Sequence, residues 1–184
     1  FDAETDVFSF SGGGVLFRRE FLDDVGLFDP RFFTYYEDLD LGWRGRRRGW
    51  RYGTVSGSIL RHIHTATTVE GSAAFLFHNE RNRLLTVARN GSLRQLASAF
   101  VGHARATLGL LRHDVFGGER ATRAGGRARL RVRGLALASA LVLLPRTLLT
   151  RGGATARRIG RRSIGLRSQP FRGTVMAMDE RPAS

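Results

Sequence analysis

The spacing of apolar residues changes near residue 75, and this change constrains the fold more than any other feature of the 184-residue chain. Before it, apolar runs are short and are separated by glycine and proline, a pattern typical of short strands, tight turns and short helices. After it, apolar residues recur every three or four positions over long stretches, which predicts amphipathic helices. The sequence therefore predicts a small mixed α/β part followed by a helical part.

The first part is predicted to contain three strands and two helices joined by an aromatic-rich loop, Leu27–Tyr36. Gly26 and Gly49 follow the helices, where glycine commonly ends a helix in a left-handed conformation. A Ser56-Gly57 turn separates the last two strands. The predicted strands are Val7–Ser11, Trp50–Val55 and Ser58–Ile63, and the predicted helices are Arg18–Val25 and Glu37–Arg48.

The second part is predicted to contain three longer helices, the last broken by Pro145 because proline lacks an amide hydrogen. Residues 117–129, rich in Gly and Arg, are predicted to be a flexible connection, and residues 150–184 a basic tail without stable structure. The predicted helices are Phe75–Arg89, Leu93–Leu111 and Leu130–Leu149, and the predicted parts of the chain are 1–90, 91–149 and 150–184.

Charge is distributed unevenly along the chain. Residues 1–40 hold ten acids against three arginines, a net charge of −7, whereas the remainder holds 27 arginines against six acids, a net charge of +21. A basic surface attracts phosphates of nucleotides, anionic lipids or nucleic acids. Cysteine is absent, which excludes disulfides, thiolate-bound zinc and iron–sulfur clusters. The start at Phe1 without methionine suggests a fragment or a processed start.

The stretch from Ser11 to Thr68 carries the residues best suited to chemistry. Its glycine-rich turn allows a ligand to approach the backbone closely. Glu37 and Asp38 are expected at a helix N-terminus beside aromatic residues, and a carboxylate there can deprotonate a hydroxyl group. A histidine pair, His62 and His64, lies at the end of the last predicted strand, and imidazole can bind a divalent cation.

In order and spacing these elements resemble the C-terminal half of the catalytic domain of family 2 glycosyltransferases, especially bacterial rhamnosyltransferase-like members. Glu80-Arg81-Asn82-Arg83 also resembles the helical segment that follows this core in many such enzymes. The resemblance rests on Ser11–Arg19 (SGGGVLFRR), Val25–Phe33 (VGLFDPRFF), Tyr35–Leu41 (YYEDLDL), Arg44, Gly49, His62, Thr65 and Thr67.

The resemblance implies a partial GT-A fold, an α/β nucleotide-diphospho-sugar transferase fold that lacks its N-terminal nucleotide-binding half and is followed by helices. It implies Asp38 as the general base of an inverting transfer, with Glu37 as the alternative base or as a partner that orients the acceptor. It implies His62 as a ligand of a divalent cation, Mg²⁺ or Mn²⁺. The substrate-binding residues that it implies are Gly12, Gly13, Gly14, Tyr36 and Arg81.

Each of these residues also has a purely structural interpretation. Asp38 could simply complement the helix dipole, and the glycines could form an ordinary bend. His64 would share the side of a strand with His62, so the sequence does not separate the two. Asp40 is expected to make a structural hydrogen bond. Tyr35 and Tyr36 could pack in the core, and Arg81 and Arg83 could lie on a solvated helix face.

The implied enzyme transfers a sugar from a nucleotide-sugar donor to a cell-surface glycan or a lipid-linked acceptor, as in cell wall biogenesis. The expected location is cytoplasmic, at the inner face of the plasma membrane. No Asp-x-Asp motif or nucleotide-binding βαβ unit precedes Ser11, so the chain alone is expected to be inactive.

The apolar stretch Gly134–Leu144 is shorter than the ~20 residues of a membrane span. Residues 91–149 are therefore expected either to lie at a membrane interface or to pack on the domain. The alternative function is a non-catalytic basic module that binds a membrane surface or nucleic acid. Nucleic acid is disfavoured, because the aromatic residues accompany acids rather than the arginine runs.

Overall fold

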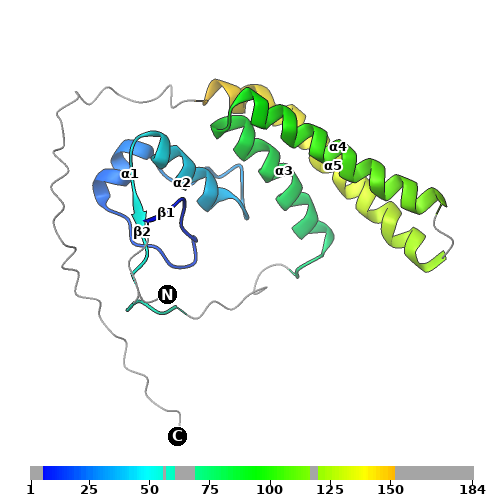
Figure 1. Ribbon diagram of the computed structural model, residues 1–184, viewed down its shortest axis with the longest axis horizontal. Helices are drawn as coiled ribbons and strands as arrows, with labels where there is room; N and C mark the ends of the chain where they lie inside the picture. Colours follow the sequence, from blue (N-terminus) through cyan, green and yellow to red (C-terminus); the bar gives the residue numbers. More distant parts are fainter. Residues whose placement is uncertain (1–5, 56, 61–68, 117–119, 152–184) are drawn as a thin grey trace, which may run out of the picture.

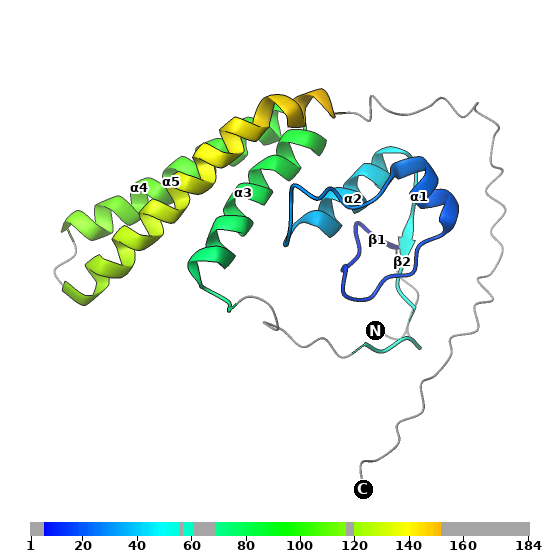
Figure 2. The same cartoon turned by 180° about the vertical axis from the view of Figure 1, so that it is seen from behind.

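The computed structural model describes residues 6–55, 57–60, 69–116 and 120–151. Figures 1 and 2 show a small lobe of short elements beside a bundle of three longer helices. The elements of the lobe are β1 (Asp6–Val7), α1 (Arg19–Val25), α2 (Glu37–Arg47) and β2 (Tyr52–Gly53), and those of the bundle are α3 (Ala73–Asn90), α4 (Leu93–Phe116) and α5 (Arg120–Leu149).

The two strands pair with each other in antiparallel fashion, with Asp6 opposite Gly53 and Val7 opposite Tyr52. The predicted hairpin around Ser56-Gly57 is therefore wrong in the described residues, because β2 pairs with β1 and residues 58–60 are not in a strand. Arg46 of α2 supports the pairing of β2 with β1, because its guanidinium contacts both segments. It donates to the Phe8 carbonyl just after β1 (3.1 Å) and lies over the ring of Tyr52 in β2. The described chain is thus mostly helical, and its α/β character is limited to this small sheet.

The lobe is organised around aromatic residues that pack on α2. Two glycines of α2 make this packing possible, because neighbouring side chains occupy the space of their missing Cβ atoms. A Cβ on Gly45 would lie 2.6 Å from Cε2 of Phe21 and closer still to the Tyr52 hydroxyl. Gly42 similarly lies against Ser9. The buried residues of this core are Phe21, Val25 and Leu41, with Phe10, Phe17, Leu22, Trp50 and Tyr52 packed against them.

A second core joins the bundle to the loop that precedes α2. Phe32 of that loop packs with residues of α3, α4 and α5 in one cluster. Residues on both sides of the boundary predicted at residue 90 therefore share a core, and the division of the chain into parts stays a prediction. The buried apolar residues of this cluster are Phe32, Leu84, Leu85, Ala99 and Ala140.

Helix α5 differs from its prediction at its N-terminal end and at Pro145, whereas its last residue, Leu149, is the predicted one. Residues 120–129 are helical rather than a flexible connection, in keeping with the high helix propensity of their Arg and Ala residues. The helix also continues through Pro145, which lies on its exposed side while Ala136, Ala140 and Thr147 are buried. Packing of the opposite face therefore outweighs the one lost hydrogen bond. Of the predicted tail, residues 152–184 lie outside the described residues.

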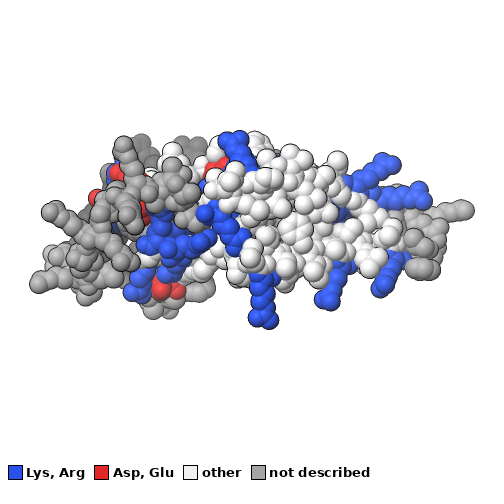
Figure 3. All heavy atoms as spheres, turned by 90° about the horizontal axis from the view of Figure 1, so that it is seen from above, with Lys and Arg blue, Asp and Glu red and all other residues white. Residues whose placement is uncertain are grey.

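The surface of the bundle is mainly apolar and basic. Figure 3 shows white atoms over much of this face with blue side chains at its rim, whereas red atoms gather toward the other end. Because α5 passes through Pro145, the stretch Gly126–Leu149 is long and apolar enough to cross a membrane, judged by length and composition alone. One side of α5 packs in the bundle, and its other side is exposed.

Candidate active site

Two carboxylates lie at the start of α2, as the sequence predicts. Glu37 is the first helical residue, and Tyr36 before it adopts a left-handed conformation (φ 69°) that turns the chain into the helix. Phe33 and Tyr35 also have positive φ angles. This conformation is rare for bulky side chains and persists only where surrounding contacts impose it. The loop therefore presents Glu37 and Asp38 at a helix N-terminus, where the helix dipole favours negative charge.

The glycine-rich turn lies directly over these carboxylates. The amide of Gly12 donates a hydrogen bond to Oδ2 of Asp38 (3.1 Å), and the amide of Leu39 donates to Oδ1 (2.7 Å). A Cβ at Gly12 would lie 3.6 Å from Cβ of Asp38 and 4.0 Å from Oε1 of Glu37. Gly12 thus brings an exposed stretch of backbone, 26 residues distant in sequence, onto both carboxylates.

Glu37 differs from Asp38 in its environment. Its Oε2 atom is buried and has no hydrogen-bond partner. Burial raises the pKa of Glu37 above its usual value, and the nearby Asp38 carboxylate adds to the rise while a backbone hydrogen bond opposes it. A carboxylate with a raised pKa and an unpaired oxygen is suited to accepting a proton. Both carboxylates therefore stay candidates for the base.

The loop that positions the carboxylates is held by Asn82 of α3. Its completely buried side-chain amide donates to the carbonyls of Phe32 (2.9 Å), Thr34 (2.7 Å) and Tyr35 (2.8 Å). Arg81 adds hydrogen bonds from Nη2 to the carbonyls of Arg31 (2.9 Å) and Phe32 (3.2 Å). These contacts account for the persistence of the left-handed residues just before α2.

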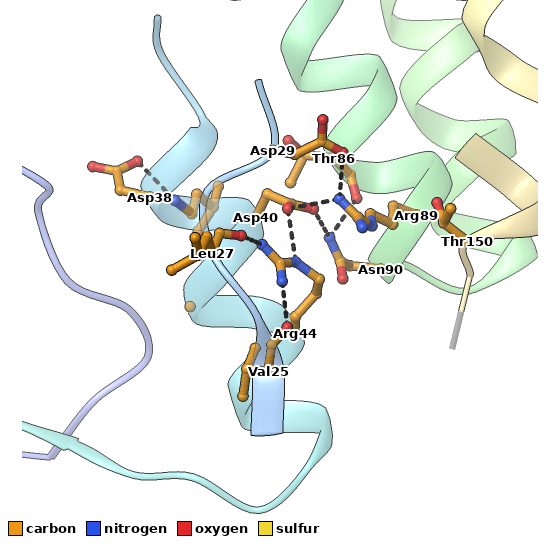
Figure 4. A network of polar contacts seen from close by, with 12 residues as sticks. Val25, Leu27, Asp29, Asp38, Asp40, Arg44, Thr86, Arg89, Asn90 and Thr150 are labelled. Atoms are coloured by element: carbon orange, nitrogen blue, oxygen red, sulfur yellow. Dashed lines mark hydrogen bonds and ion pairs between the residues drawn. The ribbon is translucent and has the colours of Figure 1, made fainter. Parts of the chain in front are cut away.

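Asp40 has a structural environment, as expected. It is completely buried and accepts hydrogen bonds from Arg44 (2.9 Å), Arg89 (3.0 Å) and Asn90 (2.8 Å). Figure 4 shows these side chains meeting between α2 and α3. Arg44 also donates to the carbonyls of Val25 (2.7 Å) and Leu27 (2.8 Å). The network fixes α2 against α3 and the segment after α1.

Asp29 extends this network from the aromatic loop. Asp29 accepts a hydrogen bond from Nη1 of Arg89 (2.8 Å) and a bidentate pair from Arg31, in which Nε donates to Oδ1 and Nη2 donates to Oδ2. Burial on its own would raise the pKa of Asp29, but hydrogen bonds and charge from Arg31, with the charge of Arg89, outweigh burial and lower the pKa to about 2. Asp29 is therefore ionised at neutral pH and ties the loop to α3.

A second ionic cluster, partly buried, joins the three helices of the bundle. Glu80 of α3 lies 2.9 Å from Nδ1 of the buried His103 on α4 and forms an ion pair with Arg133 of α5. Burial on its own would raise the pKa of Glu80, but the His103 hydrogen bond and the charge of Arg133 outweigh burial and lower it. Because Asn82 lies two residues from Glu80, this cluster supports the helix that holds the loop.

The structure therefore brings together some of the predicted site residues and separates others. Gly12, Glu37 and Asp38 meet at the start of α2. Tyr36 packs against the bundle core, and the Arg81 guanidinium contacts loop carbonyls rather than the carboxylates. Gly13 and Gly14 belong to the turn at Ser11, and Gly14 lies against Leu60. Their binding roles stay predictions.

The predicted metal ligand His62 and its neighbour His64 lie outside the described residues. Among the residues that the structure does describe, no three His, Asp or Glu side chains converge on a point that could hold a metal ion. The identity of the cation and the role of His62 therefore stay predictions.

Sequence reasoning missed Asn82, Asp29 and Arg89 as residues that position the site. Asn82 and Asp29 both lie within the stretches that carry the family resemblance, and this was the available signal for them. Arg89 had none, because its partners are 49 and 60 residues away in sequence.

Comparisons with known proteins address the same segment. Residues 1–84 match the family model described as "Glycosyltransferase like family 2". Over 78 residues the chain is 33% identical to proteins of two Mycobacterium tuberculosis strains, CDC 1551 / Oshkosh and ATCC 25618 / H37Rv, each named N-acetylglucosaminyl-diphospho-decaprenol L-rhamnosyltransferase. The match covers 42% of this chain and 25% of each relative, so it spans about a quarter of their length. No solved structure shows significant similarity.

Proposed function

We propose, because residues 1–84 match the model of the family 2 glycosyltransferases, that this chain supplies the acceptor-side half of an inverting glycosyltransferase. The observation that carries the proposal is the convergence of Gly12, Glu37 and Asp38 at the start of α2. It places two carboxylates beside an exposed turn within the segment that matches the family.

In the proposed reaction Asp38 acts as the general base. It accepts the proton of the acceptor hydroxyl as the oxygen attacks the anomeric carbon of a nucleotide sugar. The bond from that carbon to the diphosphate oxygen breaks in the same displacement, so the anomeric configuration inverts. The Gly12 and Leu39 amides leave Asp38 with further lone pairs for the proton. Glu37 is the alternative base or orients the acceptor.

The family implies a divalent cation, Mg²⁺ or Mn²⁺, at the diphosphate. The described residues hold no cluster of ligands that fits such an ion, so no step of this proposal passes through it. We keep His62 as its proposed ligand, with Gly13, Gly14, Tyr36 and Arg81 as proposed contributors to substrate binding. A nucleotide-binding half is proposed to supply the remaining contacts with the donor.

The names of the mycobacterial relatives suggest the substrates. Those proteins are named as rhamnosyl transferases that act on a sugar joined by diphosphate to decaprenol. By analogy we propose a nucleotide sugar of the hexose or rhamnose type as the donor and a lipid-linked acceptor of cell-surface glycan synthesis. The proposed location is the cytoplasmic face of the membrane, where such acceptors are anchored.

The experiment that tests this function measures acceptor-dependent release of nucleoside diphosphate from dTDP-rhamnose and UDP-sugars. We expect release from a polypeptide that joins this chain to a family 2 nucleotide-binding half. Residues 1–184 alone should give none, and calorimetry of them with UDP or dTDP and Mn²⁺ should show weak or no binding.

Two results would count against the proposal. Tight metal-dependent nucleotide binding by residues 1–184 alone would show that the donor site lies within this chain. A joined polypeptide that binds donor but retains full activity when Glu37→Gln and Asp38→Asn are combined would remove the proposed role of the carboxylates.

A further inference from the structure

From the exposed face of the helical bundle we propose that α4 and α5 lie flat on an anionic lipid surface. This inference goes beyond the proposed transferase activity and does not depend on it. It begins with α5, whose C-terminal half exposes large apolar side chains on its outward side. Leu135, Val142 and Leu149 are 64%, 79% and 78% exposed. Their seven-residue spacing keeps them on one side of the helix.

Helix α4 contributes a second exposed apolar row. Val101, Leu108 and Leu111 are about half exposed, and their spacing of seven and three residues places them on one side. Such contiguous apolar surface on a folded protein marks an interaction site. Figure 3 shows a broad face of uncharged residues from which arginine side chains project.

The charges around this face identify its partner as anionic. Residues 93–112 of α4 and 120–149 of α5 include no acidic residue, and Asp114 near the end of α4 is the one acid in these two helices. The exposed arginines of 93–112 and 126–149 form no ion pair within the described part of the chain. Arg94, Arg105 and Arg112 lie on one stripe of α4, because spacings of 11 and seven residues return to the same helix side. The exposed arginines of α5 are Arg127, Arg129, Arg131 and Arg146.

A lipid surface satisfies both features of this face, whereas the alternatives satisfy only one. Aliphatic side chains bury in the acyl boundary of a bilayer while arginines contact phosphate head groups. Nucleic acid would use the arginines, but this face offers aliphatic side chains where base stacking requires aromatic ones. The charge complementarity therefore favours anionic lipid.

The packing of α5 indicates that it lies on the membrane rather than across it. Arg133, on the packed side of α5, pairs with Glu80 of α3 in the partly buried ionic cluster. A spanning α5 would have to carry this charged cluster into the hydrocarbon region or lose its contacts with α3, and both are costly. An interfacial position keeps the bundle intact and buries only the outward face.

The test is sedimentation of the 184-residue chain with vesicles of phosphatidylcholine alone or with added phosphatidylglycerol. We expect binding to the anionic vesicles that is at least tenfold tighter than to the neutral ones and that weakens with salt. Arg105→Gln and Arg146→Gln should each weaken it by about fivefold, the effect of one charge near such a surface. Alkaline carbonate should extract the bound chain.

Two double variants with the same change in charge separate this face from the rest of the molecule. Val142→Glu with Leu149→Glu should abolish binding to anionic vesicles. Leu16→Glu with Ile59→Glu, which alters equally exposed residues of the lobe, should retain most of it. Circular dichroism should show unchanged helix content in both.

Several outcomes would overturn the proposal. Equal losses from the two double variants would show that net charge, not this face, governs binding. Binding to neutral vesicles as tight as to anionic ones would exclude the role of the arginines. Resistance to carbonate would indicate a spanning helix. Two results together would indicate a nucleic-acid surface. Duplex DNA of equal total charge would release the chain from vesicles, and the Val142→Glu and Leu149→Glu double variant would bind DNA as tightly as the unaltered chain does.

Discussion

Asn82 lies outside the candidate site but holds the loop that leads into it. Its completely buried side-chain amide donates to the carbonyls of Phe32, Thr34 and Tyr35 in the loop that ends in Tyr36. The loop adopts left-handed φ angles at Phe33, Tyr35 and Tyr36, and these need continuous support. We infer that Asn82 positions the carboxylates without contacting them.

Asn82→Ala should therefore lower the free energy of unfolding by about 1–3 kcal/mol or more. This range is the cost of leaving one buried polar group without a partner. Urea denaturation followed by circular dichroism measures this loss. Asn79→Ala is the matched control, because Asn79 donates only to a carbonyl of its own helix and should cost well under 1 kcal/mol. Equal losses in the two variants would contradict the bracing role.

At the scale of elements, α2 packs closely because it carries glycine where its neighbours lie. Gly45→Ala would place a methyl group 2.6 Å from the Phe21 ring, so the ring or the helix must move. Such overpacking typically costs ~1–3 kcal/mol. We expect thermal or urea denaturation to show a loss in this range.

Gly109→Ala on α4 is the control for this substitution, since a Cβ there meets nothing within 4 Å. Replacing an exposed helical glycine by alanine typically stabilises by ~0.5–1 kcal/mol. The two variants should thus shift stability in opposite directions. Destabilisation by Gly109→Ala, or none by Gly45→Ala, would count against the observed packing.

Helices α1 and α2 could be predicted because local signals set their limits. Gly26 and Gly49 both adopt φ 89° at the ends of these helices, as their sequence positions indicated. The pairing of β2 with β1 could not be predicted, because it depends on contacts from Arg46, about 40 residues from β1 in sequence. Continuity of α5 through Pro145 likewise depends on packing rather than on local propensity.

The same distinction applies to the candidate site. The pattern identified Gly12, Glu37 and Asp38 as a group, and the structure places them together. The sequence pattern could not identify how the loop is held, because Asn82 and Arg89 act through partners 47 to 60 residues away. Periodicity and motif spacing indicate which side chains are buried, but they do not specify long-range polar partners.

At the scale of the whole molecule, the ion pairs of Asp29 and Asp40 with Arg89 join the lobe to the bundle. Asp29 has a pKa of about 2 in the folded chain, below its ordinary value of 3.8. A pKa that is lower in the folded chain than in the unfolded chain adds to the free energy of unfolding. This contribution is fully present when the pH lies above the ordinary pKa, and it is lost as the pH falls through the pKa of the folded chain. Stability should therefore fall by about 2 kcal/mol between pH 4 and pH 2 from this group.

Urea denaturation across this pH range measures the effect. Asp29→Asn should flatten the dependence of unfolding free energy on pH, because the substituted side chain no longer titrates. Asp23→Asn, at an exposed position on α1, should leave the dependence as it is in the unaltered chain. An unchanged slope in Asp29→Asn would show that other carboxylates carry the acid sensitivity.

Catalysis is also a property of the whole molecule, since donor and acceptor sides must act together. The central claim is that Asp38 accepts the proton of the acceptor hydroxyl. A base contributes chiefly in the transition state, so its removal should lower kcat while donor binding stays nearly unchanged. Asp40→Asn, in contrast, should lower stability more than turnover, because Asp40 is buried among its hydrogen-bond partners.

The most direct test is the turnover number of Asp38→Asn in the joined polypeptide, measured beside its donor dissociation constant. The account predicts a loss of roughly 10²–10⁴-fold in kcat, the usual contribution of general-base catalysis, with donor affinity within a few-fold of the unaltered enzyme. Near-normal turnover of Asp38→Asn together with loss of turnover in Glu37→Gln would contradict the assignment and give the role of base to Glu37.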